Sequence, residues 1–250
     1  MPLPDASASS SSPKPKIEYV IFDMDDNILA RYGKEMTWEI KAGLMGKPER
    51  QAAEHLLSFF PGISLTIEEY LRERDAQQDI IWPHVRPLPG AARLVQHLHA
   101  HGIPIALATG SRRGKFQLKS ANLPEIFGCF EGNIVCGDDG WFEKSRGKPC
   151  PDIFLVAAKE MLKRDVGTGE VQDAGVEDVK VRKKGLIFED ALPGVEAGKR
   201  AGMNVVWVPD ANLLEVGSSA IHEADEVLRS LEKFDPAKWG LPPFKTDELK

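Results

Sequence analysis

IEYVIFDMDD, residues 17–26, begins with an apolar, β-branched run and ends in a cluster of acidic residues. The run 17–23 has the length and composition of a parallel strand that is buried on both faces. Asp23 and Asp25 are separated by Met24, so in extended backbone both carboxylates leave the same face. The stretch therefore predicts a buried strand that delivers two carboxylates at its end.

Further apolar runs along the chain have the same character and alternate with helical patterns. The predicted strands are 103–109, 133–139, 185–190 and 203–210. The predicted helices between them are 90–102, 151–162 and 193–202. This alternation predicts an α/β fold, a Rossmann-like parallel sheet wrapped by helices, with the functional site at the carboxyl ends of the strands.

Residues 36–82 interrupt this alternation, because they carry a helical pattern throughout. Ser64 or Thr66 is expected to cap a helix that runs from Ile67 to about Gln77. The Gly-rich stretch 164–178 is predicted to be a surface loop. We therefore expect three parts: a disordered tail at 1–16, a core formed by 17–26 and 84–250, and a helical cap at 27–83.

The composition of the chain argues against nucleic-acid binding and against a membrane span. The net charge of −6, with no basic stripe, argues against nucleic acid as a partner. No apolar run approaches eighteen residues, so no membrane span is expected. The cysteines, Cys129, Cys136 and Cys150, have no metal-ligand spacing and are interpreted as reduced thiols. We expect a cytoplasmic monomer that acts on a small molecule.

Polar residues stand at the carboxyl ends of three predicted strands: Asp23 on one, Thr109 on another, and Glu189 with Asp190 on a third. Such a group of carboxylates repels itself unless a divalent cation is bound, and Mg²⁺ prefers oxygen ligands of this kind. Thr109 offers a hydroxyl, and Lys148 offers a point charge suited to a phosphoryl oxygen. Each motif alone is more often a solvated turn, and only the ordered set indicates chemistry.

The ordered set of motifs resembles the haloacid dehalogenase superfamily, and most closely its phosphatase branch. The matching motifs are FDMD, ALATGS, GKPCPDIF and FEDALPGVEAGKRAG. Residues 81–244 also resemble the subgroup of pseudouridine-5'-phosphatase and related sugar-phosphate phosphatases, notably in IVCGDD and KFDPAKWGLPPF. The resemblance implies a sheet with the first strand at its centre, a helical cap, and Mg²⁺-dependent hydrolysis of a small phosphate monoester.

The resemblance also implies roles for the acidic residues. Asp23 would be the nucleophile that forms an aspartyl-phosphate. Asp25 would protonate the leaving alcohol and then deprotonate the attacking water. Mg²⁺ would be held by an Asp23 carboxylate oxygen, the Asp25 carbonyl and the Asp190 side chain, with Glu189 assisting through water.

The phosphate-binding residues implied by the same resemblance are Thr109, Gly110, Ser111 and Lys148. Thr109 and Lys148 would bind the transferring oxygens and stabilise the ionised nucleophile. Ser111 would help to bind them, and a helix N-cap role for this serine is an equal alternative.

The sequence departs from the family pattern directly after the second aspartate. Asp26 and Asn27 stand where the family has D-x-D-G and then an apolar residue. Either substitutions have altered this loop, or a segment of roughly fifteen residues, about four helical turns, is absent. The helical spacing of Ile28, Leu29 and Tyr32 favours the deletion.

The deletion would remove the flap that closes over the phosphate, and Asp25 would lie at the edge of the gap. Since a shift of about 1 Å can cost on the order of a hundredfold in rate, we expect greatly reduced turnover. Two alternative hypotheses are a weak or inactive remnant that binds a phosphometabolite and a phosphomutase on the same scaffold.

Overall fold

The computed structural model describes residues 16–23, 40, 43–44, 49–141, 146–211, 213 and 223–245. Their framework is a six-stranded sheet in the order β3-β2-β1-β4-β5-β6, with every neighbouring pair parallel. The strands are β1 (Tyr19–Phe22), β2 (Ile105–Thr109), β3 (Ile134–Cys136), β4 (Gly185–Glu189), β5 (Asn204–Trp207) and β6 (Glu226–Val227). The predicted α/β fold and the central position of the first strand are confirmed.

Strand β1 is buried on both faces, which explains its uninterrupted apolar sequence. Val20 and Phe22 pack into one half of the core, whereas Tyr19 and Ile21 pack into the other. Because alternate side chains serve opposite layers, a polar residue inside this strand would be buried. The first polar position is Asp23, where the strand ends.

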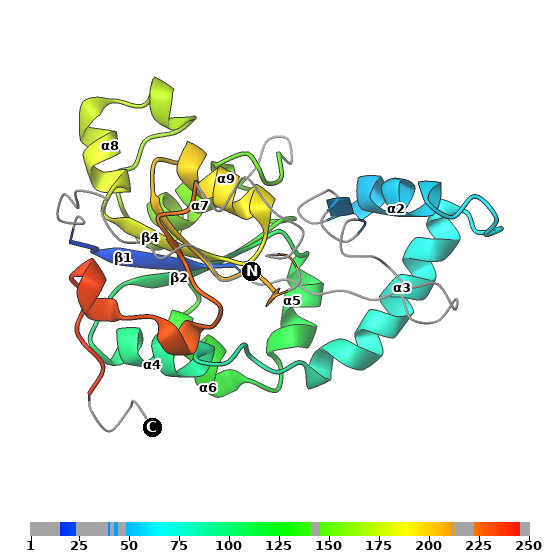
Figure 1. Cartoon of the computed structure of the whole chain (residues 1–250), viewed down its shortest axis with the longest axis horizontal. Helices are drawn as coiled ribbons and strands as arrows, with labels where there is room; N and C mark the ends of the chain where they lie inside the picture. Colours follow the sequence, from blue (N-terminus) through cyan, green and yellow to red (C-terminus); the bar gives the residue numbers. More distant parts are fainter. Residues whose placement is uncertain are drawn as a thin grey trace.

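Helices cover both faces of the sheet (Figure 1). One layer contains α4 (Ala91–Ala100), α5 (Arg113–Ser120), α6 (Pro124–Phe127), η3 (Gly128–Phe130), η7 (Leu231–Lys233) and η8 (Pro236–Trp239). The opposite layer contains α7 (Asp152–Val156), the π-helical turn η4 (Ala157–Met161) and α9 (Leu192–Arg200). No helix in the described part of the chain is long and apolar enough to cross a membrane.

The interpretation of 164–178 as a surface loop is wrong in part. This stretch contains η5 (Val171–Asp173) and the first residues of α8 (Val176–Arg182). Arg182 is fully buried and donates hydrogen bonds to the carbonyl oxygens of Val166 and Thr168, at 2.6 and 3.1 Å. A buried guanidinium thus satisfies loop carbonyls and fixes the stretch to the core.

Two long helices lie between β1 and β2 in the chain and form a helical insert at one side of the core (Figure 1). They are α2 (Glu49–Ser58) and α3 (Ile67–Ile81), followed by the short turn η2 (Trp82–His84). The predicted helix is confirmed, although it continues past Gln77 to Ile81. The predicted tail, apart from Lys16, and most of the first half of the predicted cap lie outside the described residues.

Thr66 is the N-cap of α3 and forms a capping box with Glu69. The Glu69 amide donates to the Thr66 hydroxyl oxygen at 3.2 Å, and the Thr66 amide donates to the Glu69 carboxylate at 2.9 Å. Each bond satisfies an amide that the helix itself leaves without a partner.

Replacing Thr66→Ala removes the side-chain acceptor and should lower the free energy of unfolding by about 1 kcal/mol. Urea denaturation followed by circular dichroism measures the change. Thr66→Ser keeps the hydroxyl, so its free energy of unfolding should stay close to that of the unchanged protein. An equal loss of stability in both variants would show that the hydroxyl cap does not stabilise the helix.

Candidate functional site

The carboxyl ends of β1 and β4 bring acidic residues together. Asp23 follows β1, and its amide donates to the Phe188 carbonyl of β4 at 3.1 Å. Glu189 ends β4 and Asp190 follows it. The side chains of Asp23, Glu189 and Asp190 each place a carboxylate oxygen within 4.8 Å of the others. The predicted convergence of these residues is therefore present.

Lys148 lies between two of these carboxylates. Its Nζ is 2.6 Å from Asp23 Oδ1 and also forms an ion pair with Glu189 Oε1. The three side chains are only 7%, 3% and 0% exposed for Lys148, Asp23 and Glu189. Burial lowers the pKa of Lys148, but the two carboxylates raise it by more, so the ammonium stays charged at neutral pH.

Glu189 is held in place by backbone groups as well as by Lys148. Its Oε2 accepts hydrogen bonds from the amides of Asp190 and Ala191, at 3.0 and 3.1 Å. Burial and the neighbouring Asp23 raise the pKa of Glu189 well above its ordinary value, while Lys148 lowers it. Glu189 therefore positions Lys148 and the start of α9, a role that the sequence analysis did not assign.

Asp190 is positioned through its backbone. The indole Nε1 of Trp207, a fully buried side chain of β5, donates to the Asp190 carbonyl at 2.9 Å. This bond fixes the residue directly after β4 while its side chain joins the acidic cluster. In the sequence Trp207 is only an apolar residue of a predicted strand, so nothing there predicted its hydrogen bond to Asp190.

Gly194, in the first turn of α9, packs directly against the Glu189 carboxylate. A Cβ at this position would lie 1.8 Å from Glu189 Oε1, closer than any nonbonded contact allows. The glycine is therefore required by the close approach of the buried carboxylate.

Replacing Gly194→Ala should lower the free energy of unfolding by about 2 kcal/mol, because the carboxylate can move away only by giving up its bonds to Lys148 and to two backbone amides. Gly114→Ala is the matched control, since Gly114 lies in α5 and has nothing within 4 Å of the added Cβ. Alanine there should be neutral or stabilising, as helix propensity predicts. Urea denaturation measures the free energy of unfolding of both variants. An equal change in the two would contradict the close contact of Gly194 with the Glu189 carboxylate.

The predicted phosphate-binding turn, residues 109–111, follows β2. Thr109 is fully buried, and its Oγ1 accepts a hydrogen bond from the Ser111 amide at 3.1 Å. Helix α5 begins at Arg113 with Arg112 as its N-cap, so the alternative N-cap role for Ser111 is wrong. The turn ends before the helix, which leaves Ser111 beside the site and not inside α5.

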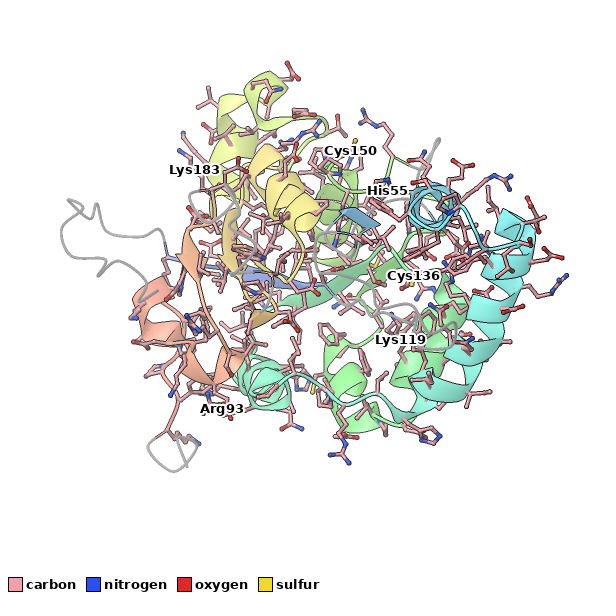
Figure 2. All side chains as sticks on the ribbon, turned by 45° about the vertical axis from the view of Figure 1, so that its right-hand side comes forward. His55, Arg93, Lys119, Cys136, Cys150 and Lys183 are labelled. Atoms are coloured by element: carbon pink, nitrogen blue, oxygen red, sulfur yellow. The ribbon has the colours of Figure 1, made fainter. Side chains whose placement is uncertain are left out.

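A lysine that the sequence analysis did not single out adjoins this turn. Lys119 of α5 is 2% exposed, and its Nζ lies 3.4 Å from Ser111 Oγ and 4.4 Å from the centre of the Trp82 ring. Figure 2 shows Lys119 on the side of the core that faces α3, and Lys183 on the far side. The i,i+4 spacing of Lys115 and Lys119 was the available signal.

Asp25, the predicted acid/base, lies outside the described residues, and so do Asp26, Asn27 and the loop that follows them. Their predicted roles and the predicted deletion stay predictions. The three cysteines are free thiols, as expected.

A sequence model described as hydrolase, haloacid dehalogenase-like hydrolase, matches residues 17–202 of this chain. The chain belongs to the haloacid dehalogenase-like hydrolases. The resemblance inferred from its motifs is thereby confirmed.

Curated relatives within this family of hydrolases are named as phosphatases. (DL)-glycerol-3-phosphatase 2 of Arabidopsis thaliana is 38% identical over 254 aligned positions, which include 95% of this chain and 97% of that protein. A Drosophila melanogaster protein named "Probable pseudouridine-5'-phosphatase" is 36% identical over 243 positions, covering 92% and 96% of the two chains. Both names agree with the predicted subgroup and with a phosphoric monoester hydrolase.

A solved structure supports the fold. A haloacid dehalogenase family hydrolase from Deinococcus radiodurans, crystallised with bound phosphate and sodium, aligns with a TM-score of 0.62 and 21% identity. The alignment covers 93% of this chain and 100% of that one. At this identity the likeness extends to the fold alone.

Proposed function

We propose that this chain is a Mg²⁺-dependent phosphatase that hydrolyses a small phosphate monoester through an aspartyl-phosphate on Asp23. The observation that carries the proposal is the buried ion-paired group of Asp23, Lys148 and Glu189, with Asp190 beside it, at the carboxyl edge of the sheet. Membership of a hydrolase family whose relatives are named as phosphatases supports the same reaction.

The acidic cluster fits a divalent cation. Asp23 and Asp190 together carry more negative charge than the single Lys148 ammonium balances, and hard oxygen donors within 4.8 Å of one another suit Mg²⁺. Asp23 and Asp190 would hold the ion by their side chains, with the Asp25 carbonyl as the third protein ligand. The bound ion supplies charge neutralisation and orientation of the phosphoryl group.

The remaining chemistry belongs to the protein. A carboxylate oxygen of Asp23 attacks phosphorus, and the alcohol leaves with a proton from Asp25. Water then cleaves the aspartyl-phosphate, with Asp25 as the base. Lys148 keeps Asp23 ionised and binds a transferring oxygen, while Thr109, Gly110 and Ser111 bind the others.

The aligned lengths support the deletion interpretation of the loop. The Arabidopsis alignment runs over 254 positions, whereas 95% of this 250-residue chain is about 238 residues. The Drosophila alignment has 243 positions against about 230 residues, which is 92% of the chain. Both alignments thus contain about fifteen positions without a residue of this chain, which is the length that the deletion predicts. On this proposal, loss of a flap beside Asp25 would reduce turnover, because the site would be less well closed to water.

The proposed substrates are phosphate esters of a sugar, a nucleoside or a small polyol. The names of the relatives, for glycerol 3-phosphate and pseudouridine 5'-phosphate, support this range. The phosphomutase alternative has no support from these relatives. The cytoplasmic location and the monomeric state remain predictions from the sequence.

Replacing Asp23→Asn removes the nucleophile and should lower kcat by on the order of a thousandfold or more. Release of nitrophenol from p-nitrophenyl phosphate with Mg²⁺ measures it. Asp173→Asn, an exposed aspartate of η5, is the control and should keep full activity. Equal release by the Asp23 variant would refute the assignment. Stabilisation of the unchanged chain by Mg²⁺ and fluoroberyllate, without turnover on a phosphate-ester panel, would instead identify a binding remnant.

Replacing the residues that follow Asp25 with the corresponding loop of the Arabidopsis relative should raise kcat by about a hundredfold, because the proposed flap and the acid/base would regain their positions. Phosphate release from a metabolite panel compares the two chains. An insert of the same length made of Gly and Ser controls for loop length alone. If the restored chain were no faster, the loop would not be the cause of weak turnover.

A further inference from the structure

The loop that follows β3 is bonded to the turn that follows β2. The Gly137 amide donates to the Ser111 carbonyl at 3.0 Å. The Arg113 amide, the first of α5, donates to Asp138 Oδ1 at 2.7 Å. Because α5 has no side-chain cap from its own N-cap residue, this distant carboxylate satisfies an amide that the helix leaves open.

Asp139 makes the strongest of these connections. Its Oδ2 accepts from Arg113 Nη2 at 2.5 Å and from the Cys136 amide at 2.8 Å, and its Oδ1 accepts from Arg113 Nε at 3.2 Å. The same Arg113 nitrogen donates to the Ile134 carbonyl at 3.0 Å. The Asp139 side chain is 14% exposed and the Arg113 side chain 38%, so water is excluded from the carboxylate end of this two-point ion pair.

Gly137 brings the two backbones into direct contact. A Cβ on Gly137 would lie 2.3 Å from the Gly110 carbonyl oxygen. Only glycine allows this approach, and the turn cannot shift towards β3 without meeting the loop. Figure 2 labels Cys136, the last residue of β3, on the side of the core nearest to α5 and α3.

We propose that the loop Gly137–Asp139 sets the position of the phosphate-binding turn Gly110–Ser111, and that Asp139 is its positioning residue, acting through Arg113. The proposal rests on the proposed function, since it assigns the turn to phosphate. A turn held on its outer side by fixed hydrogen bonds is preorganised for an anion and needs no rearrangement when phosphate binds. The IVCGDD motif thereby acquires a function in addition to its place in β3.

The test compares Asp139→Asn with Glu170→Gln. The asparagine keeps the shape but loses the charge and one acceptor. Glu170 forms the same kind of pair with Arg200, at similar exposure, and is not part of the site. Titration calorimetry with Mg²⁺ and fluoroberyllate should show about tenfold weaker binding for Asp139→Asn, the loss of one charge-assisted hydrogen bond. Glu170→Gln should bind as the unchanged chain does, and Asp139→Glu should recover part of the loss.

Amide hydrogen exchange without ligand separates this inference from the proposed function. Exchange at residues 110–113 should be about tenfold faster in Asp139→Asn and unchanged in Glu170→Gln. If the unchanged chain fails to bind fluoroberyllate, the proposed function falls and the exchange result alone decides the positioning. Unchanged exchange at 110–113, or equal binding of the mimic by a binding-competent chain and its Asp139 variant, overturns the proposal.

A second pair of variants applies if Asp139→Asn does not fold. Gly137→Ala must displace the Gly110 carbonyl and should give the same faster exchange and weaker binding. Gly140→Ala, three residues further along, has nothing within 4 Å of its added Cβ and should change neither. Equal behaviour of the two alanine variants would contradict the proposed contact.

Discussion

The ion pair of Lys148 with Asp23 and Glu189 is the interaction on which the site depends. Lys148 is buried between both carboxylates, and Glu189 also accepts two backbone amides, so removal of one of the three side chains would leave the others without their compensation. The close packing of Gly194 and the inward amides after β4 follow from the need to satisfy Glu189. The need to pair the buried Glu189 carboxylate thus determines the backbone geometry around the acidic cluster.

The phosphate-binding turn is organised differently. The loop after β3 supports it through the Gly137 amide, the Asp138 carboxylate and the ion pair of Asp139 with Arg113, and Thr109 of β2 accepts a bond from the Ser111 amide. The Lys119 ammonium of α5 also lies 3.4 Å from the Ser111 hydroxyl. The acidic cluster and the turn therefore lie at the ends of neighbouring strands yet are fixed by separate sets of contacts.

The sequence predicted the strands and the polar residues at their ends, but few of the contacts that hold those residues in place. Apolar runs at strand length identified β1, β2, β4 and β5, and the polar residues at their ends followed from the parallel topology. Helix α5 was not predicted, because RGKFQLKS has a weak apolar pattern and its buried Lys119 has the character of a solvated residue. The role of Arg182 was also invisible, since its partners are carbonyl oxygens, which no sequence pattern records. Asp25 lies outside the described residues, so its part of the site rests on the resemblance.

Helix α5 joins the helical insert to the site. Near its middle, Lys115 forms an ion pair with Asp79 of α3 at 2.8 Å, and Trp82 after α3 lies beneath the α5 lysines. Its first residue, Arg113, is bonded to the loop beside the phosphate-binding turn. A single helix of eight residues thus contacts both the helical insert and the loop beside the turn. The insert and the loop that supports the phosphate-binding turn therefore share one structural element, so the packing of α3 and the placement of the anion-binding backbone both depend on where α5 lies.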